Sequence, residues 1–199
     1  MATTLVLSLT SCTQQMSNQP ATAEEPLEVV VERSKAVRPQ WMTASPGQLF
    51  AAGGEIRMLT TRSRLSNLIL GLNQTEIAAL DATKLAVATR IQAQLIDFTP
   101  NSTPLLKQRW QRMVLESTAK VATSVIKVSD IYYEGITRQV ANAQDPIRQY
   151  YLVAVLVSLP KETITGIYND LARRLVNEPE SDWQALVARL KQVLALGTK

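Results

Sequence analysis

The stretch Thr103–Asn142 reads TPLLKQRWQRMVLESTAKVATSVIKVSDIYYEGITRQVAN, and it decides the fold that the sequence predicts. Pro104 follows Thr103 in the order of a helix N-cap and a first-turn proline. Charged and polar residues then recur at steps of three and four, which is the spacing of one helix face. We therefore expect a single long helix, although the β-branched residues between 121 and 133 also suit a strand.

Apolar residues form two further rows along the same stretch. A helix with so wide an apolar surface needs more than one neighbour to cover it. We therefore expect this helix to lie at the centre of an all-α bundle of five or six helices. The other expected helices cover residues 47–70, 74–97, 147–158, 161–176 and 182–196.

Caps and prolines set the boundaries of these other helices. Ser45-Pro46 and Asp145-Pro146 are start signals, and Gly71-Leu72-Asn73 predicts a stop and a restart. The segment 147–158 is apolar on all sides, which we interpret as a helix buried on all sides. Gly53-Gly54 lies inside the first expected helix and predicts a kink or a later start there.

The N-terminal part of the chain differs from the rest in composition. Residues 13–26 are polar and contain two prolines, and we expect a flexible tether over 13–44. Within it, 27–32 is rich in β-formers and is a possible short strand. Trp41 is expected to anchor the tether on the core. The helical domain is then 45–199.

Residues 1–12 contain a short apolar run that ends in the only cysteine of the chain. Leu9-Thr10-Ser11-Cys12 resembles the lipobox of bacterial lipoproteins, in which the cysteine carries acyl chains such as palmitate. The resemblance implies a signal segment over 1–12, lipidation at Cys12, and attachment to a membrane on its periplasmic or lumenal face. A second interpretation omits the lipid and predicts a soluble cytoplasmic helical interaction protein.

Composition excludes several kinds of site. The chain has no histidine, which removes the commonest general base and metal ligand. One cysteine can form neither an internal disulfide nor a cysteine metal cluster. The net charge of +4 is spread along the chain without a dense basic stripe, so no nucleic-acid partner is expected. We predict no cofactor and no metal.

Carboxylates are the remaining candidates for catalysis. Asp130 and Glu134 stand four residues apart, and two carboxylates can flank a glycosidic bond. Glu116-Ser117 resembles the pair at the catalytic acid of lytic transglycosylases, but the glycine-rich turn and the Gly-Leu-Met-Gln element of that family are absent. We therefore predict a protein that is not an enzyme, with a carboxylate-only hydrolase as the alternative.

The predicted function is a non-catalytic, membrane-anchored lipoprotein. Its helical domain would bind or scaffold a protein complex at the membrane surface. The alternative is a ligand-binding helical module with a cavity between the helices at 103–142 and 147–158. Basic residues that could face a partner or lipid are Arg57, Arg62, Arg64, Lys107, Arg109 and Arg112.

Overall fold

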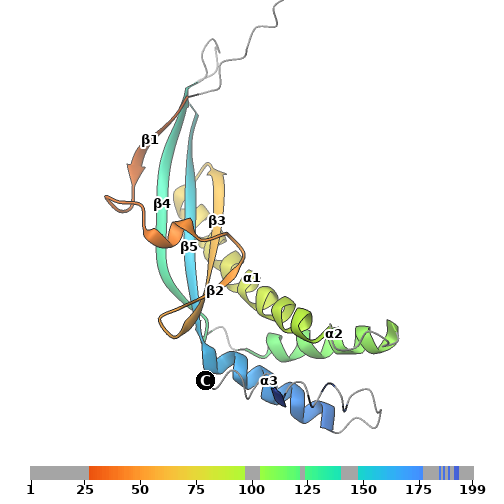
Figure 1. The fold of residues 1–199 in the computed structure, drawn as a ribbon. Helices are drawn as coiled ribbons and strands as arrows, with labels where there is room; N and C mark the ends of the chain where they lie inside the picture. The colour runs from red at the N-terminus through yellow and green to blue at the C-terminus, as the bar shows by residue number, and fades with distance from the viewer. Residues whose placement is uncertain are drawn as a thin grey trace, which may run out of the picture.

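The computed structural model describes residues 27–96, 104–121, 124–139, 148–176, and residues 184, 186, 188, 191 and 192. Five antiparallel strands form one sheet in the order β1-β4-β5-β3-β2 (Figure 1). The expected all-α bundle is therefore wrong. The fold combines this sheet with three labelled α-helices, one of which lies along a face of the sheet.

The first expected helix is a β-hairpin. Strand β2 (Leu49–Ala52) and strand β3 (Glu55–Leu65) pair antiparallel around Gly53-Gly54. Both glycines have positive φ, 58° and 82°, which a two-residue hairpin turn requires and a helix forbids. The two glycines that we interpreted as a kink are therefore the turn itself.

The prediction of one long helix over Thr103–Asn142 is also wrong. Its first half forms α2 (Pro104–Ala119), and its second half forms strand β4 (Lys127–Gln139). The β-branched and aromatic residues of the second half pack well on a pleated surface, and this packing outweighs the helix-like spacing of the charges. A spacing of four, as between Asp130 and Glu134, places two side chains on one face in either structure.

The segment expected as a fully buried helix is the central strand β5 (Arg148–Pro160). It pairs with β4 on one side and with β3 on the other. Residues 153–159 are all buried, because both faces of the sheet are covered along this part of the strand. A strand covered on both faces reads as a continuous apolar run, which periodicity alone does not distinguish from a buried helix.

Helix α1 (Leu68–Ile96) covers the expected helix from residue 74 to residue 96 and begins six residues earlier, and residue 97 lies outside the described residues. The predicted stop at Gly71 is wrong. The chain instead enters the helix at Asn67, whose side chain accepts a hydrogen bond from the backbone N–H of Leu70 at 3.0 Å. Gly71 lies inside the helix, and glycine fits this position because a Cβ there would come within 2.8 Å of Leu65.

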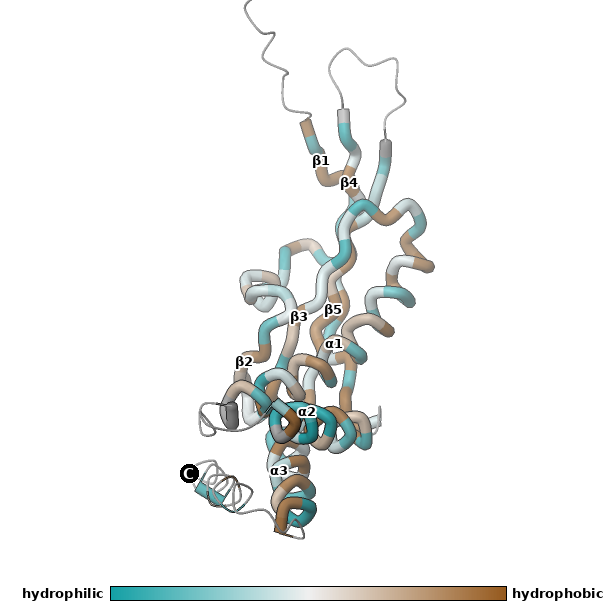
Figure 2. Tube along the Cα trace, turned by 90° about the vertical axis from the view of Figure 1, so that its right-hand side faces the viewer, coloured by the Kyte–Doolittle hydropathy of each residue, from teal (hydrophilic) through white to brown (hydrophobic). Residues whose placement is uncertain are grey.

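Helix α1 changes its buried side along its length. In its first half, Ala79 packs on the sheet against β5, together with Leu68 and Leu72. In its second half, Val87, Ala88 and Ile91 pack in a different cluster with α2. The apolar residues therefore follow no single stripe, and Figure 2 shows hydrophobic residues distributed along α1.

The second cluster also contains helix α3 (Lys161–Val176), which has the expected bounds. Trp110 and Val114 of α2 meet Leu171 and Leu175 of α3 there. The helix expected over 182–196 lies largely outside the described residues. Residues 184, 186, 188, 191 and 192 are helical, and Leu186 is buried in the same cluster. None of the described helices is long and apolar enough to span a bilayer.

Candidate functional site

A polar cluster lies on the sheet face opposite α1, where the connection between β1 (Leu27–Arg33) and β2 crosses the sheet. The two strands are at opposite edges, so the connection must pass over β4, β5 and β3. It does so through the short 3-10 helix η1 (Gln40–Thr43) (Figure 1). As expected, Trp41 packs on the core, with Met42 and Ala44, against Leu59, Tyr132 and Ala154.

Glu134 is the buried centre of this polar cluster. Arg38 donates two hydrogen bonds to its carboxylate, Nε to Oε1 at 3.1 Å and Nη2 to Oε2 at 2.6 Å. The hydroxyl of Tyr132 donates a third at 2.8 Å, and Arg33 lies 3.7 Å from Oε1. Burial alone would raise the pKa of Glu134, but the bonds from Arg38 and Tyr132 outweigh it and lower the pKa. Glu134 is therefore held as a carboxylate.

Asp130 makes the second attachment of the crossing segment. Its carboxylate accepts bonds from Lys35 Nζ at 2.5 Å, from the Trp41 indole at 2.9 Å and from the backbone N–H of Ile131 at 2.9 Å. Burial would raise the pKa of Asp130, but Lys35 and Trp41 lower it below its ordinary value. A general acid needs a raised pKa, which neither carboxyl of this pair has.

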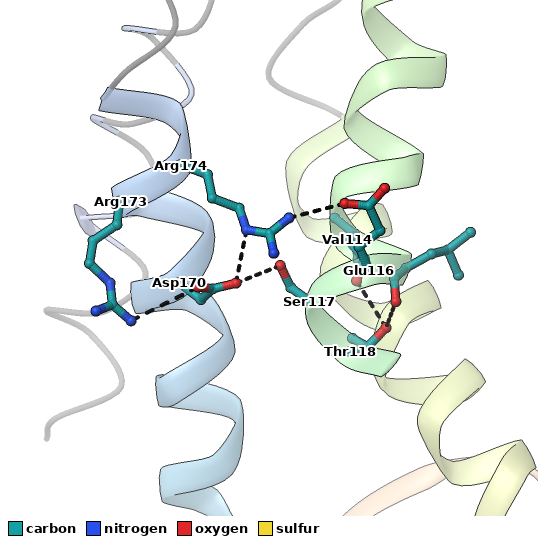
Figure 3. Close-up of polar contacts among 8 residues, drawn as sticks. Val114, Glu116, Ser117, Thr118, Asp170, Arg173 and Arg174 are labelled. Atoms are coloured by element: carbon teal, nitrogen blue, oxygen red, sulfur yellow. Dashed lines mark hydrogen bonds and ion pairs between the residues drawn. The ribbon is translucent and has the colours of Figure 1, made fainter. Parts of the chain in front are cut away.

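A second polar cluster joins α2 to α3 (Figure 3). The buried hydroxyl of Ser117 donates to Asp170 at 2.9 Å, and Arg174 bridges Asp170 and Glu116 at 3.0 and 3.2 Å. Burial raises the pKa of Asp170, but Ser117 and Arg174 outweigh this effect and lower it. Glu116 is exposed and is tied to Arg174, so the Glu116-Ser117 pair lies at a helix–helix contact.

An open apolar groove of about 650 Å³ lies between α1 and the β2–β3 hairpin. The groove adjoins the second half of α1, where Val87, Ala88 and Ile91 pack in one cluster with α2 and with Ile56 of the hairpin. Small side chains of α1 leave the space, and Leu49, Met58 and Leu85 are its large apolar residues. Arg90 is the charged residue in the lining. Leu85 is 61% exposed, so the groove presents an apolar side chain to solvent.

The expected cavity between helices at 103–142 and 147–158 does not form, since the second of these segments is β5 and the first is split. The groove beside α1 was not predicted from the sequence. Its signal was the absence of one apolar stripe in α1, which indicates that the helix turns different sides to different neighbours.

The six basic residues do not form one surface. Three lie on β3 and three on α2. Arg57 pairs with Glu55 at 3.2 Å, and Arg64, seven residues further along the strand, is roughly 20 Å away. On α2, Lys107, Arg109 and Arg112 are all exposed. Cys12 lies outside the described residues.

Across the described segments there is no group of three or more acidic or cysteine side chains placed to hold a metal ion. Comparisons with protein-family models, with curated proteins and with solved structures gave no match.

Proposed function

We propose that the protein is a non-catalytic lipoprotein, attached to a membrane through Cys12, whose folded domain binds a partner protein in the groove between α1 and the β2–β3 hairpin. The partner segment is apolar and carries an acidic residue opposite Arg90. The observation that carries the proposal is the groove itself, with the exposed side chain of Leu85 in its lining.

The shape of the groove favours a protein segment over an enclosed small molecule. Binding pockets for small molecules are concave and bury most of the ligand, whereas this groove is open along the length of α1 between Ala82 and Ala93. It also lies beside β2, a strand at the edge of the sheet. A free edge strand and an apolar groove are both surfaces that bind peptide segments.

The carboxylates support the non-catalytic part of the proposal. Asp130, Glu134 and Asp170 all have lowered pKa values, and each is bonded to side chains of another segment. Their partners come from the crossing segment and from α2, so these carboxylates attach elements of the fold to one another.

The anchor is tested by fractionating cells that express the wild type or Cys12→Ser and by measuring the mass of each protein. The proposal predicts a membrane-bound wild type with a lipid mass on Cys12 and a soluble serine variant. An unmodified wild type with Met1 intact, soluble like the variant, contradicts the anchor.

The groove is tested separately with two matched leucine variants. Leu85→Ser alters the groove, and Leu105→Ser alters a leucine on α2 that is 67% exposed and is not part of the groove lining. After gentle solubilisation, a partner that co-purifies with the wild type and Leu105→Ser should be lost from Leu85→Ser. Equal recovery with both variants contradicts the groove as the binding surface.

A further inference from the structure

Another cavity, of about 430 Å³, is lined by residues at the ends of β3 and β4 and at the start of β5, which is the end of these strands away from α2 and α3. Its lining is Arg64, Ser66, Arg138, Gln149 and Tyr150. Two arginines, two hydroxyls and an amide converge on it, which is a donor-rich lining suited to an anion. The Nε atom of Arg138 is buried and has no hydrogen-bond partner within the part of the chain that the structure describes.

The backbone at Arg64, one of the lining residues, has a disfavoured conformation. The pairing of β3 with β5 shifts by one residue between Arg62 and Leu65, and Arg64 has φ of 60°. A non-glycine residue in this conformation is disfavoured by about 1–2 kcal/mol. A bulge of this kind re-aims a side chain, and here it brings Arg64 into the same lining as Arg138.

One acidic residue near the cavity offsets part of the positive charge of its two arginines. Glu28 of β1 is in register with Arg138, and burial together with the nearby carboxylate of Glu28 raises the pKa of Tyr150. Glu28 therefore offsets part of the positive charge of Arg138. The site keeps a net positive charge from Arg64.

The position of the cavity relates it to the proposed anchor. Leu27, the first described residue, pairs with Gln139, so the chain enters the sheet at the cavity end. Residues 13–26, for which the sequence predicts a tether, separate Cys12 from that point, and a tether of this length would span about 20 Å. Exposed apolar side chains lie near the same end, Leu27 on β1 and Ile69 and Leu70 in the first turn of α1.

We infer that this cavity binds the phosphate of an anionic lipid headgroup, with the guanidiniums of Arg64 and Arg138 as its principal ligands. The exposed apolar residues at the same end then contact the interfacial region of the bilayer, where basic and apolar side chains act together. The lipid assignment rests on the proposed anchor, because the anchor places this end of the fold next to the membrane. The anion site itself rests only on the arginine pair and the cavity.

The test uses the full chain with Cys12→Ser, so that no acyl chain contributes to binding. Co-sedimentation is measured with vesicles of phosphatidylcholine alone and with vesicles containing a third phosphatidylglycerol. Binding should require phosphatidylglycerol and weaken with salt. Arg64→Gly should lower the affinity at least about fivefold, the effect of one charge near a membrane. Because glycine accepts the positive φ, this variant should melt at or near the wild-type temperature.

Two further variants test whether the charge at the cavity, and not the charge of the whole protein, sets the affinity. Glu28→Gln removes the moderating charge and should raise the affinity. Lys107→Gln combined with Arg112→Gln removes two charges from α2 and should leave binding within about twofold, since those residues are far from the cavity.

The inference is overturned if Arg64→Gly binds the anionic vesicles as the wild type does, or if the α2 control loses as much affinity. Saturable binding of glycerol phosphate without binding to anionic vesicles would contradict the inference that the bound phosphate belongs to a lipid. The two proposals are tested independently. The fractionation experiment tests lipidation at Cys12, whereas vesicle binding is measured on a variant that lacks Cys12 and so tests only the cavity.

Discussion

The guanidinium of Arg38 and the carboxylate of Glu134 form a two-point ion pair between the crossing segment and the centre of β4. The side chain of Glu134 is only 2% exposed, whereas that of Arg38 is 56% exposed. The guanidinium of Arg38 therefore covers the buried carboxylate of Glu134 on its solvent side. It fixes a segment that connects the two outermost strands and would otherwise have few backbone contacts with the sheet.

Removing the arginine should cost more than removing an exposed cation. Arg38→Ala leaves the buried carboxylate of Glu134 with Tyr132 and the more distant Arg33. We expect a loss of about 2–3 kcal/mol in the free energy of unfolding, measured with urea. Lys35→Ala is the control, because its pair with Asp130 is largely solvated and should contribute about 1 kcal/mol or less. Equal losses in the two variants would contradict this assignment.

Acid should weaken the fold through the same carboxylates. The folded pKa of Glu134 lies below the ordinary value of 4.5, and those of Asp130 and Asp170 lie below 3.8. Each carboxylate therefore stabilises the fold above its unfolded pKa, and this stabilisation is lost as the pH falls through the folded pKa. We expect the free energy of unfolding to fall below about pH 5.

Glu134→Gln isolates the contribution of one group to this acid effect. The variant should be less stable than the wild type at pH 7, and the gap should narrow at pH 3, where protonation begins to remove the wild-type charge as well. Urea unfolding at both pH values measures the gap. A gap that stays constant would mean that the charge of Glu134 contributes no stability.

The contact between α2 and α3 should depend on Ser117. Ser117→Ala removes a buried donor to Asp170, and we expect a loss of about 1 kcal/mol in stability. Arg173→Ala should lower stability less than Ser117→Ala does, because the side chain of Arg173 is 79% exposed and its pair with Asp170 is long at 3.9 Å. Thermal unfolding followed by circular dichroism compares the two. A larger effect for Arg173→Ala would contradict the arrangement in Figure 3.

Replacing each of two glycines by alanine should change the stability of the protein in opposite directions. Gly166 lies within α3 with open space around its Cβ position, so Gly166→Ala should stabilise the protein by about 0.5–1 kcal/mol. Gly54 has φ of 82° in the β2–β3 turn, so Gly54→Ala should destabilise it by about 1 kcal/mol or more. Changes of the same sign in the two variants would mean that one of these elements is assigned wrongly.

The sequence allowed α3 and the start of α2 to be predicted, because a proline stands at the start of each helix. Most of α1 was also predicted as helix, but the start expected at Asn73 was wrong, because the helix begins at Leu68. The helix predicted over the residues of β4 was wrong, since charges four residues apart share a face in a helix and in a strand alike. The same ambiguity affected β5, where burial on both faces removes the alternation that identifies a strand. Gly53-Gly54 was the clearest strand signal, because paired glycines fit a hairpin turn better than a helix interior.

The sites were less predictable than the helices. Asp130 and Glu134 share one face, but it is the face of a strand and not of the expected helix, and their partners lie on a segment about 90 residues away. Arg64 was one of six basic candidates, and only the sheet register brings it near Arg138 and Tyr150. Such non-local pairings depend on strand order, which local spacing does not specify.

Site-specific photo-crosslinking in membranes of expressing cells tests the central claim most directly. A photoreactive amino acid replaces Leu85 in the groove or Leu105 on α2 in the otherwise wild-type chain. Our account predicts a discrete adduct with one partner protein from position 85 and none of that size from position 105. Adducts of equal yield from both positions, or none from position 85 in correctly membrane-bound protein, would contradict it.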